Sequence, residues 1–132
     1  NVNTEITGGN SKKLKEVLSY IDAHYMEELT ISGLAGICFF SEYYFMRFFK
    51  KYMGMSCVQY IKNVRLERAA DQFENGETNT LEVALACGFS NLSYFHREFK
   101  KKYGMTPKRF ISLSARAADF HEIVNNYHFY DS

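Results

Sequence analysis

The stretch FHREFKKKYGMTPKRF, Phe95–Phe110, has a counterpart fifty residues earlier, FMRFFKKYMGMSCVQY, Phe45–Tyr60. Over residues 35–55 the comparison gives twelve identical pairs, at an offset of 49 for 35–41 and of 50 for 44–55. The earlier members are Ala35, Cys38, Phe40, Ser41, Tyr44, Phe45, Arg47, Phe49, Lys50, Lys51, Gly54 and Met55. This self-similarity predicts two homologous units, each with a short helix, a turn and a longer helix.

Residues that start and stop helices divide the chain into about seven short helices. Ser41 and either Ser90 or Asn91 precede the two repeated segments, and Gly54 and Gly104 follow them, as expected for helix caps. The other predicted helices begin near Ser11, Thr30, Ser56, Thr80 and Pro107. No segment alternates with period two for long enough to predict a strand. The pattern predicts an all-α fold.

We expect five segments. They are a linker or chain end at 1–10, a first helix-turn-helix subdomain at 11–55, a linker helix at 56–75, a second subdomain at 76–113 and a tail at 114–132. In the tail, Ala117, Phe120, Val124 and Tyr127 have helical spacing. An extra amphipathic helix is therefore expected there, which either docks on the domain or serves a partner chain.

Composition disfavours several classes of protein. The three cysteines, Cys38, Cys57 and Cys87, lack C-x-x-C spacing, so we expect reduced buried thiols and neither a metal site nor a cofactor. No apolar run of about 18 residues and no basic-then-apolar leader occurs, which predicts a cytoplasmic protein without a membrane partner.

Positive charge is concentrated in the two repeated segments, although the formal net charge is only +1. Residues 43–68 contain six basic side chains against one acidic, and residues 92–111 contain six against one. Two basic patches, one in each unit, suggest two contacts with a polyanion. A solvated charged surface is the alternative that charge alone leaves open.

Helical periodicity separates two faces on each repeated helix. The predicted inward faces carry Phe45, Phe48, Phe49 and Tyr52 in the first copy and Leu92, Phe95, Phe99 and Tyr103 in the second. The predicted outward faces carry Tyr43, Met46, Arg47 and Lys50, then Ser93, His96, Arg97 and Lys100. An outward arginine can donate two hydrogen bonds to O6 and N7 of guanine, so these faces suit a DNA major groove.

Further basic and helix-starting residues suit DNA phosphates, because lysines and free helix N-terminal amides attract anions. The candidate phosphate contacts are Ser41, Lys50, Lys51, Asn91, Lys100, Lys101, Thr106 and Lys108.

The segment ALACGFSNLSYFHREFKKKYGMTPKRF, residues 84–110, resembles the signature of AraC/XylS-type transcriptional regulators, and the resemblance extends over about residues 11–113. It implies a seven-helix DNA-binding domain with two homeodomain-like helix-turn-helix subdomains on an asymmetric operator in the bacterial nucleoid. By position, the implied base-reading residues are Tyr43, Met46, Arg47, Ser93, His96 and Arg97. It also implies a transcriptional role, activation being expected, with a sensor or receiver domain preceding this segment and RNA polymerase as a candidate partner.

The first unit departs from the family pattern. Phe39 stands where the second unit has the turn residue Gly88, and Ser56-Cys57 replaces Thr106-Pro107. Phe39 costs little at this turn if its backbone keeps a negative φ, and we expect Cys57 only to lack the preset backbone angle of proline.

An enzyme and a protein-interaction module are the alternatives to a DNA-binding regulator. For an enzyme, no nucleophile, base and orienting group can be assembled from the sequence, and no phosphate-binding glycine loop occurs. Some DNA-repair methyl-acceptor proteins carry a similar helical domain, but they need a cluster of zinc-bound cysteines that this sequence lacks. The second alternative is a helical module whose basic faces bind an acidic protein.

Overall fold

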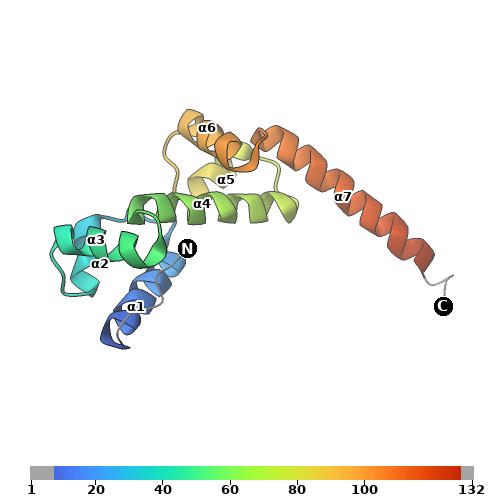
Figure 1. Ribbon diagram of the computed structural model, residues 1–132. Helices are drawn as coiled ribbons and strands as arrows, with labels where there is room; N and C mark the ends of the chain where they lie inside the picture. Colours follow the sequence, from blue (N-terminus) through green and yellow to red (C-terminus); the bar gives the residue numbers. More distant parts are fainter. Residues whose placement is uncertain (1–7, 129–132) are drawn as a thin grey trace. The chain divides into compact units, whose positions relative to one another are not determined.

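The computed structural model describes residues 8–128, which form seven α-helices and no strand (Figure 1). These are α1 Gly8–His24, α2 Ile31–Ile37, α3 Glu42–Met53, α4 Cys57–Glu74, α5 Thr80–Ala86, α6 Leu92–Tyr103 and α7 Pro107–His128. The predicted fold class is confirmed: α2–α3 and α5–α6 are helix-turn-helix pairs, joined by the long α4. The chain divides into two compact units, Asn1–Arg65 and Leu66–Ser132, so their boundary lies within α4.

Caps account for the ends of the two recognition-type helices. The Ser41 hydroxyl accepts a hydrogen bond of 3.2 Å from the amide of Tyr44, and Asn91 Oδ1 accepts one of 2.8 Å from that of Tyr94. Gly54 and Gly104 follow the last helical residues with φ of 78° and 75°, a region where glycine has no steric cost. Helices α3 and α6 start and end at the caps expected from sequence, and α4 lies within the expected linker helix, one residue shorter at each end.

Three expected boundaries differ from the structure. Helix α1 begins at Gly8, so residues 8–10 belong to a helix and not to a linker. The N-cap of α5 is Asn79, one residue before the expected Thr80, because Asn79 Oδ1 accepts a hydrogen bond of 3.0 Å from the amide of Glu82. The tail forms no separate helix: α7 starts at Pro107 and continues to His128.

The core of unit 1 lies under the inner face of α3. Phe45, Phe48, Phe49 and Tyr52 are buried there, as the periodicity predicted. They pack with apolar residues of α1, α2 and the first half of α4, namely Val17, Ile21, Leu34, Ala35, Cys38, Cys57 and Ile61. Burial of these side chains supplies the main stabilising term for the unit.

The core of unit 2 is an aromatic cluster around Phe73 of α4. Its ring centroid lies 6.5 Å from that of Phe95 and 5.7 Å from that of Phe99, in edge-to-face arrangements. The predicted inward face was wrong at two positions. Leu92 is 37% exposed because it is the first residue of α6, whereas Glu98, at the position equivalent to Phe48, is only 6% exposed.

Helix α4 has no single apolar face because its halves serve different cores. Ile61 packs in unit 1, and Leu66 and Phe73 are buried on the unit 2 side of the boundary. At the end of the unit 1 half, Arg65 donates hydrogen bonds of 2.7 Å to the carbonyl of Tyr25 and 2.8 Å to that of Glu27. Arg65 therefore fastens α4 to the segment between α1 and α2.

The short helices α2 and α5 end in the same hydrogen-bond pattern. The amide of Phe40 donates to the carbonyl of Ala35 at 3.0 Å, and that of Phe39 to Gly36 at 3.1 Å, which is a Schellman motif. This motif needs a left-handed residue after the cap. That residue is Gly88 in unit 2, with φ of 100°, and Phe39 in unit 1, with φ of 60°. The negative φ that would make Phe39 inexpensive at this turn is therefore not found, because the motif requires the positive value.

The three cysteines are free and buried. Burial raises the pKa of the Cys57 thiol to about 12 and that of Cys87 to about 11, and it also raises the pKa of Cys38. Among residues 8–128, no group of His, Cys, Asp or Glu side chains is arranged to hold a metal ion. Within the same range, no helix combines the length and apolar character needed to cross a membrane.

The C-terminal half of α7 extends beyond the other helices of unit 2 (Figure 1). Residues 115–126 are all exposed, including Phe120 at 64%. This part of the tail therefore does not dock on its unit, contrary to one expectation. The structure does not describe the side chain of Tyr127, the last residue of the helical pattern expected in the tail.

Candidate nucleic-acid interface

The outward face of α3 consists of the side chains that periodicity selected. Tyr43 is 68% exposed and Met46 47%, and Arg47 and Lys50 are also exposed. They lie on α3 opposite the buried aromatic face, which holds the helix to its unit. An exposed row of this kind on a capped helix is available to contact a groove.

Arg47 and Tyr43 form one arrangement on this face. Arg47 Nη1 donates a hydrogen bond of 3.2 Å to the Tyr43 hydroxyl, and its guanidinium carbon lies 5.5 Å from the centroid of the tyrosine ring. Residues four apart on a helix are neighbours, which allows this contact. The guanidinium is thereby oriented before any ligand binds.

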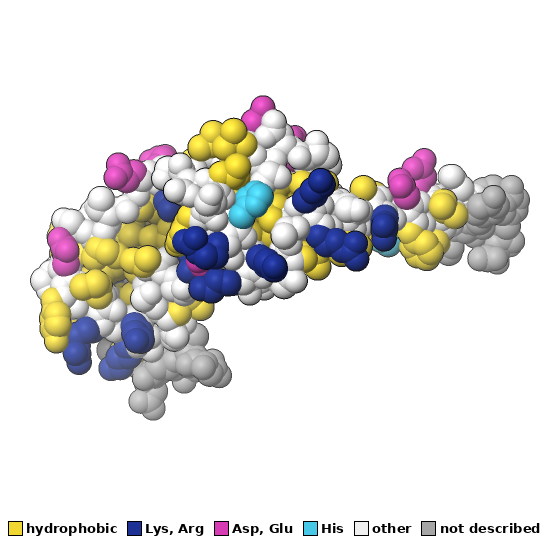
Figure 2. Space-filling model, turned by 90° about the horizontal axis from the view of Figure 1, so that it is seen from above, with side chains coloured by type: hydrophobic (Ala, Val, Ile, Leu, Met, Phe, Trp, Pro, Cys, Tyr) yellow, Lys and Arg dark blue, Asp and Glu magenta, His cyan; other side chains and the backbone are white. Residues whose placement is uncertain are grey.

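A hollow of about 250 Å³ borders the outward face of α3. Its wall combines the predicted residues Tyr43, Met46, Arg47 and Lys50 with Ile31 of α2 and with Ser56, Cys57 and Val58 at the start of α4. Ile31 and Val58 were not predicted as site residues. In Figure 2, exposed apolar side chains lie beside Lys and Arg in the part formed by α2 and α3.

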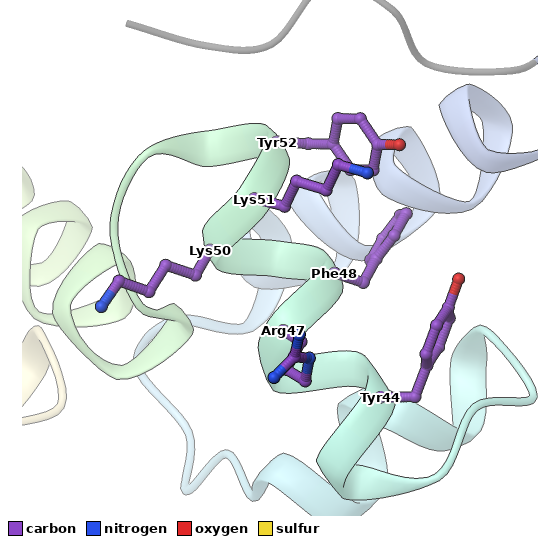
Figure 3. A pocket seen from close by; sticks show the side chains of 6 residues that line it. All are labelled: Tyr44, Arg47, Phe48, Lys50, Lys51 and Tyr52. Atoms are coloured by element: carbon purple, nitrogen blue, oxygen red, sulfur yellow. The ribbon is translucent and has the colours of Figure 1, made fainter.

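A second hollow, of about 490 Å³, shares Arg47 and Lys50 with the first (Figure 3). Its lining is Tyr44, Arg47, Phe48, Lys50, Lys51 and Tyr52. Figure 3 shows Lys50 and Lys51 pointing in different directions, with Lys51 alongside Tyr52. The Lys51 ammonium lies 5.2 Å from the centroid of that ring, so the aromatic face helps to position the charge.

The outward face of α6 is polar. Ser93, His96 and Arg97 are all exposed, as predicted. The Arg97 guanidinium carbon lies 5.3 Å from the centroid of Tyr94, and its Nε lies 3.7 Å from the carboxylate of Glu98. The buried Glu98 therefore orients Arg97 at the edge of the recognition face.

The candidate phosphate contacts fall into two groups. Lys50, Lys51, Lys100, Lys101 and Lys108 are exposed, and Lys101 also lies 3.8 Å from Glu98. Ser41, Asn91 and Thr106 are occupied as helix caps, Thr106 accepting the amide of Arg109 at 3.2 Å. The first amides of a helix have no partner within it, so a capped start still presents donors to an anion.

Several charges counted in the basic patches have structural partners. Arg65 binds backbone carbonyls, Arg68 lies 3.8 Å from Asp71, and Lys102 lies 3.5 Å from Glu67 of α4. Sequence also missed Val58, although the repeat aligns it with the candidate Lys108 and could have indicated its position. Nothing local in the sequence indicated Ile31, because its place beside α3 depends on how α2 packs.

Comparison with known proteins identifies the same architecture. A family model described as a helix-turn-helix domain matches residues 34–112. The bifunctional transcriptional activator/DNA repair enzyme AdaA of Bacillus subtilis is 39% identical over 98 residues, which are 74% of this chain and 46% of AdaA. The chain thus spans less than half of that relative.

Solved structures agree with this comparison. An AraC-type transcriptional regulator from Chromobacterium violaceum superimposes with a TM-score of 0.74 at 28% identity, covering 83% of this chain and 97% of that one. The DNA-binding domain of AdpA, solved with a target DNA, gives 0.73 at 25% identity, covering 76% and 91%. With two helix-turn-helix pairs joined by one long helix, this chain belongs to the AraC-type helix-turn-helix family of DNA-binding transcriptional regulators.

Proposed function

We propose that this chain binds an asymmetric double-stranded DNA site by placing α3 and α6 in successive major grooves. The supporting observation is the same construction in both units: a buried aromatic face, a capped start and an exposed face carrying an oriented arginine. The base-reading residues are Tyr43, Met46, Arg47, Ser93, His96 and Arg97. The exposed lysines and the starts of α3, α6 and α7 contact phosphates.

The length of α4 supports a two-groove arrangement. Its 18 residues span about 27 Å at 1.5 Å per residue. One turn of B-DNA is about 34 Å. The shortfall predicts either bent DNA or weaker seating of one unit on straight DNA. A circular-permutation gel assay that finds an unbent, fully protected site would contradict this part of the proposal.

The biological role proposed is activation of transcription in the bacterial cytoplasm, at the nucleoid, with RNA polymerase as a partner. A sensor or receiver domain is proposed to precede this segment in the full protein, because the chain spans only 46% of AdaA and 33% of the regulatory protein PocR of Salmonella typhimurium.

No catalytic activity is proposed for this segment. Cys57 and Cys87 are poor nucleophiles, since burial raises the pKa of both thiols far above neutrality. DNA repair belongs to AdaA by its name and is not transferred to this chain.

The decisive experiment is selection of binding sites from a pool of random duplexes, followed by a salt titration on the selected site. We expect one preferred sequence and a steep loss of affinity with rising salt, because lysine and arginine contacts release counterions from DNA. Equal binding to all duplexes would refute sequence-specific recognition and favour a module that binds acidic proteins.

A further inference from the structure

The recognition surfaces of the two units have the same framework but opposite chemistry. At an offset of 50, three exposed positions are apolar in unit 1 and polar or basic in unit 2. The pairs are Tyr43 with Ser93, Met46 with His96 and Val58 with Lys108. The arginines are retained in both units, as Arg47 and Arg97, so the difference concerns the residues around them.

The apolar residues of unit 1 form one surface. Tyr43 is 68% exposed, Met46 47% and Val58 63%, and all three line the hollow of about 250 Å³ together with the partly buried Ile31. Val58 stands at the start of α4, where unit 2 has a lysine suited to phosphate. Exposed apolar side chains of α3 and α4 and the partly buried Ile31 of α2 therefore meet beside Arg47.

We propose that unit 1 selects its half of the DNA site by contact with the C5-methyl groups of pyrimidines, while unit 2 selects by hydrogen bonds. This inference rests on the proposed function. The contact surface is formed by Tyr43, Met46 and Val58, and Arg47 supplies one guanine contact beside it. The methyl-bearing bases are thymine and, equally, 5-methylcytosine.

The chemistry of the major groove leads to this assignment. The methyl group of thymine is the apolar feature that a base pair displays there, whereas the other base-edge groups are hydrogen-bond donors or acceptors. An apolar surface placed against a polar edge would remove water without replacing its hydrogen bonds. Met46 is unbranched and adapts its shape, and Arg47 holds the Tyr43 ring in place through its hydroxyl.

The test uses three random-duplex pools that differ in one substituent. The first contains thymine, the second contains deoxyuridine in place of thymidine, and the third contains deoxyuridine together with 5-methyldeoxycytidine. From the transfer free energy of one methyl group, we expect that replacing one contacted thymine by uracil weakens the affinity of the protein for the duplex about fourfold. In the third pool, 5-methylcytosine should be selected at the same positions.

Variants assign the effect to unit 1. On the selected duplex, the loss caused by a single thymine-to-uracil change should disappear in Met46→Ala and in Met46→Gln, because a double-mutant cycle detects only groups that interact. His96→Ala, the matched change in unit 2, should retain the full loss. Both Met46 variants alter an exposed side chain, and their melting temperatures check that unit 1 stays folded.

The outcomes separate the two proposals. If no sequence is selected from the thymine pool, the proposed function fails, and this inference fails with it. If a sequence is selected but uracil is accepted everywhere without loss, only the methyl-contact inference is overturned. The same conclusion holds if the loss persists unchanged in both Met46 variants.

Discussion

Phe39 and Gly88 occupy equivalent positions, directly after the C-caps of α2 and α5, so replacing Phe39 by glycine tests the backbone cost at this position. Each follows the C-cap of a seven-residue helix, and each has a positive φ, 60° at Phe39 and 100° at Gly88. The hydrogen bonds that close the two ends also match, with Phe40 to Ala35 at 3.0 Å and Phe89 to Ala84 at 2.9 Å. We therefore predict that Phe39→Gly stabilises unit 1.

The magnitude follows from two opposing terms. A residue with a Cβ pays about 1–2 kcal/mol in the left-handed region. Substitution by glycine removes this cost, but it lowers the stability by about 0.4–1 kcal/mol because the unfolded chain becomes more flexible. The Phe39 ring is 91% exposed, so little burial is lost with it. The net gain expected is roughly 0.5–1 kcal/mol, or about 2–8 °C in the melting temperature of a unit of this size.

The assay is urea unfolding followed by circular dichroism at 222 nm. We expect a higher midpoint at an unchanged slope, since the surface exposed on unfolding is nearly the same. Phe39→Ala is the matched control, because it removes the ring but keeps the backbone cost. Gly88→Ala should destabilise unit 2 by a similar amount. The reasoning is refuted if Phe39→Gly is neutral or destabilising, or if Phe39→Ala stabilises equally.

Three further predictions concern the interface, the packing of α4 and the thiols. Arg97→Ala should reduce the binding free energy on the selected duplex by about 1–3 kcal/mol and relax the base preference at one position, whereas Lys108→Ala should weaken binding to all duplexes alike. Gel-shift titrations with single-base variants of the duplex distinguish the two outcomes. A uniform loss for Arg97→Ala would remove Arg97 from the base-reading residues. Arg65→Ala should lower the free energy of unfolding by about 1.5–3 kcal/mol, because two hydrogen bonds from a charged group, of 2.7 and 2.8 Å, are lost. Urea unfolding measures this change. An unchanged free energy of unfolding would mean that water replaces both hydrogen bonds. Stability should fall from about pH 9, the ordinary thiol value, towards pH 11–12, because the unfolded chain releases protons that the folded chain keeps on Cys57 and Cys87, whose pKa values are about 12 and 11. Cys57→Ala should make the alkaline decline of unfolding free energy shallower, and an unchanged decline would exclude Cys57 as a contributor.

Sequence predicted the helices and the main faces of this protein because both depend on residues close together in the chain. Ser41, Gly54, Asn91 and Gly104 act through hydrogen bonds and backbone angles within one helical turn. The buried face of α3 follows from residues three and four apart. The two units were recognisable because the repeat preserves these local signals.

Other features depended on packing between segments distant in sequence. Arg65 reads as part of a basic patch, but it binds carbonyls about forty residues away. Glu98 counts in the sequence only as the acidic residue of segment 92–111, but it is buried on the inner side of α6, beside Arg97 and Lys101.

The hollow beside α3 shows the same distinction at the candidate interface. Tyr43 and Met46 were selected by helical spacing, whereas Ile31 and Val58 lie on other helices and share this surface through the packing of α2 and α4; the repeat indicates only that Val58 is equivalent to Lys108. Local sequence therefore determined which side chains of each helix face outward. Tertiary packing decided which side chains from different helices share one surface, because that depends on contacts between segments far apart in the chain.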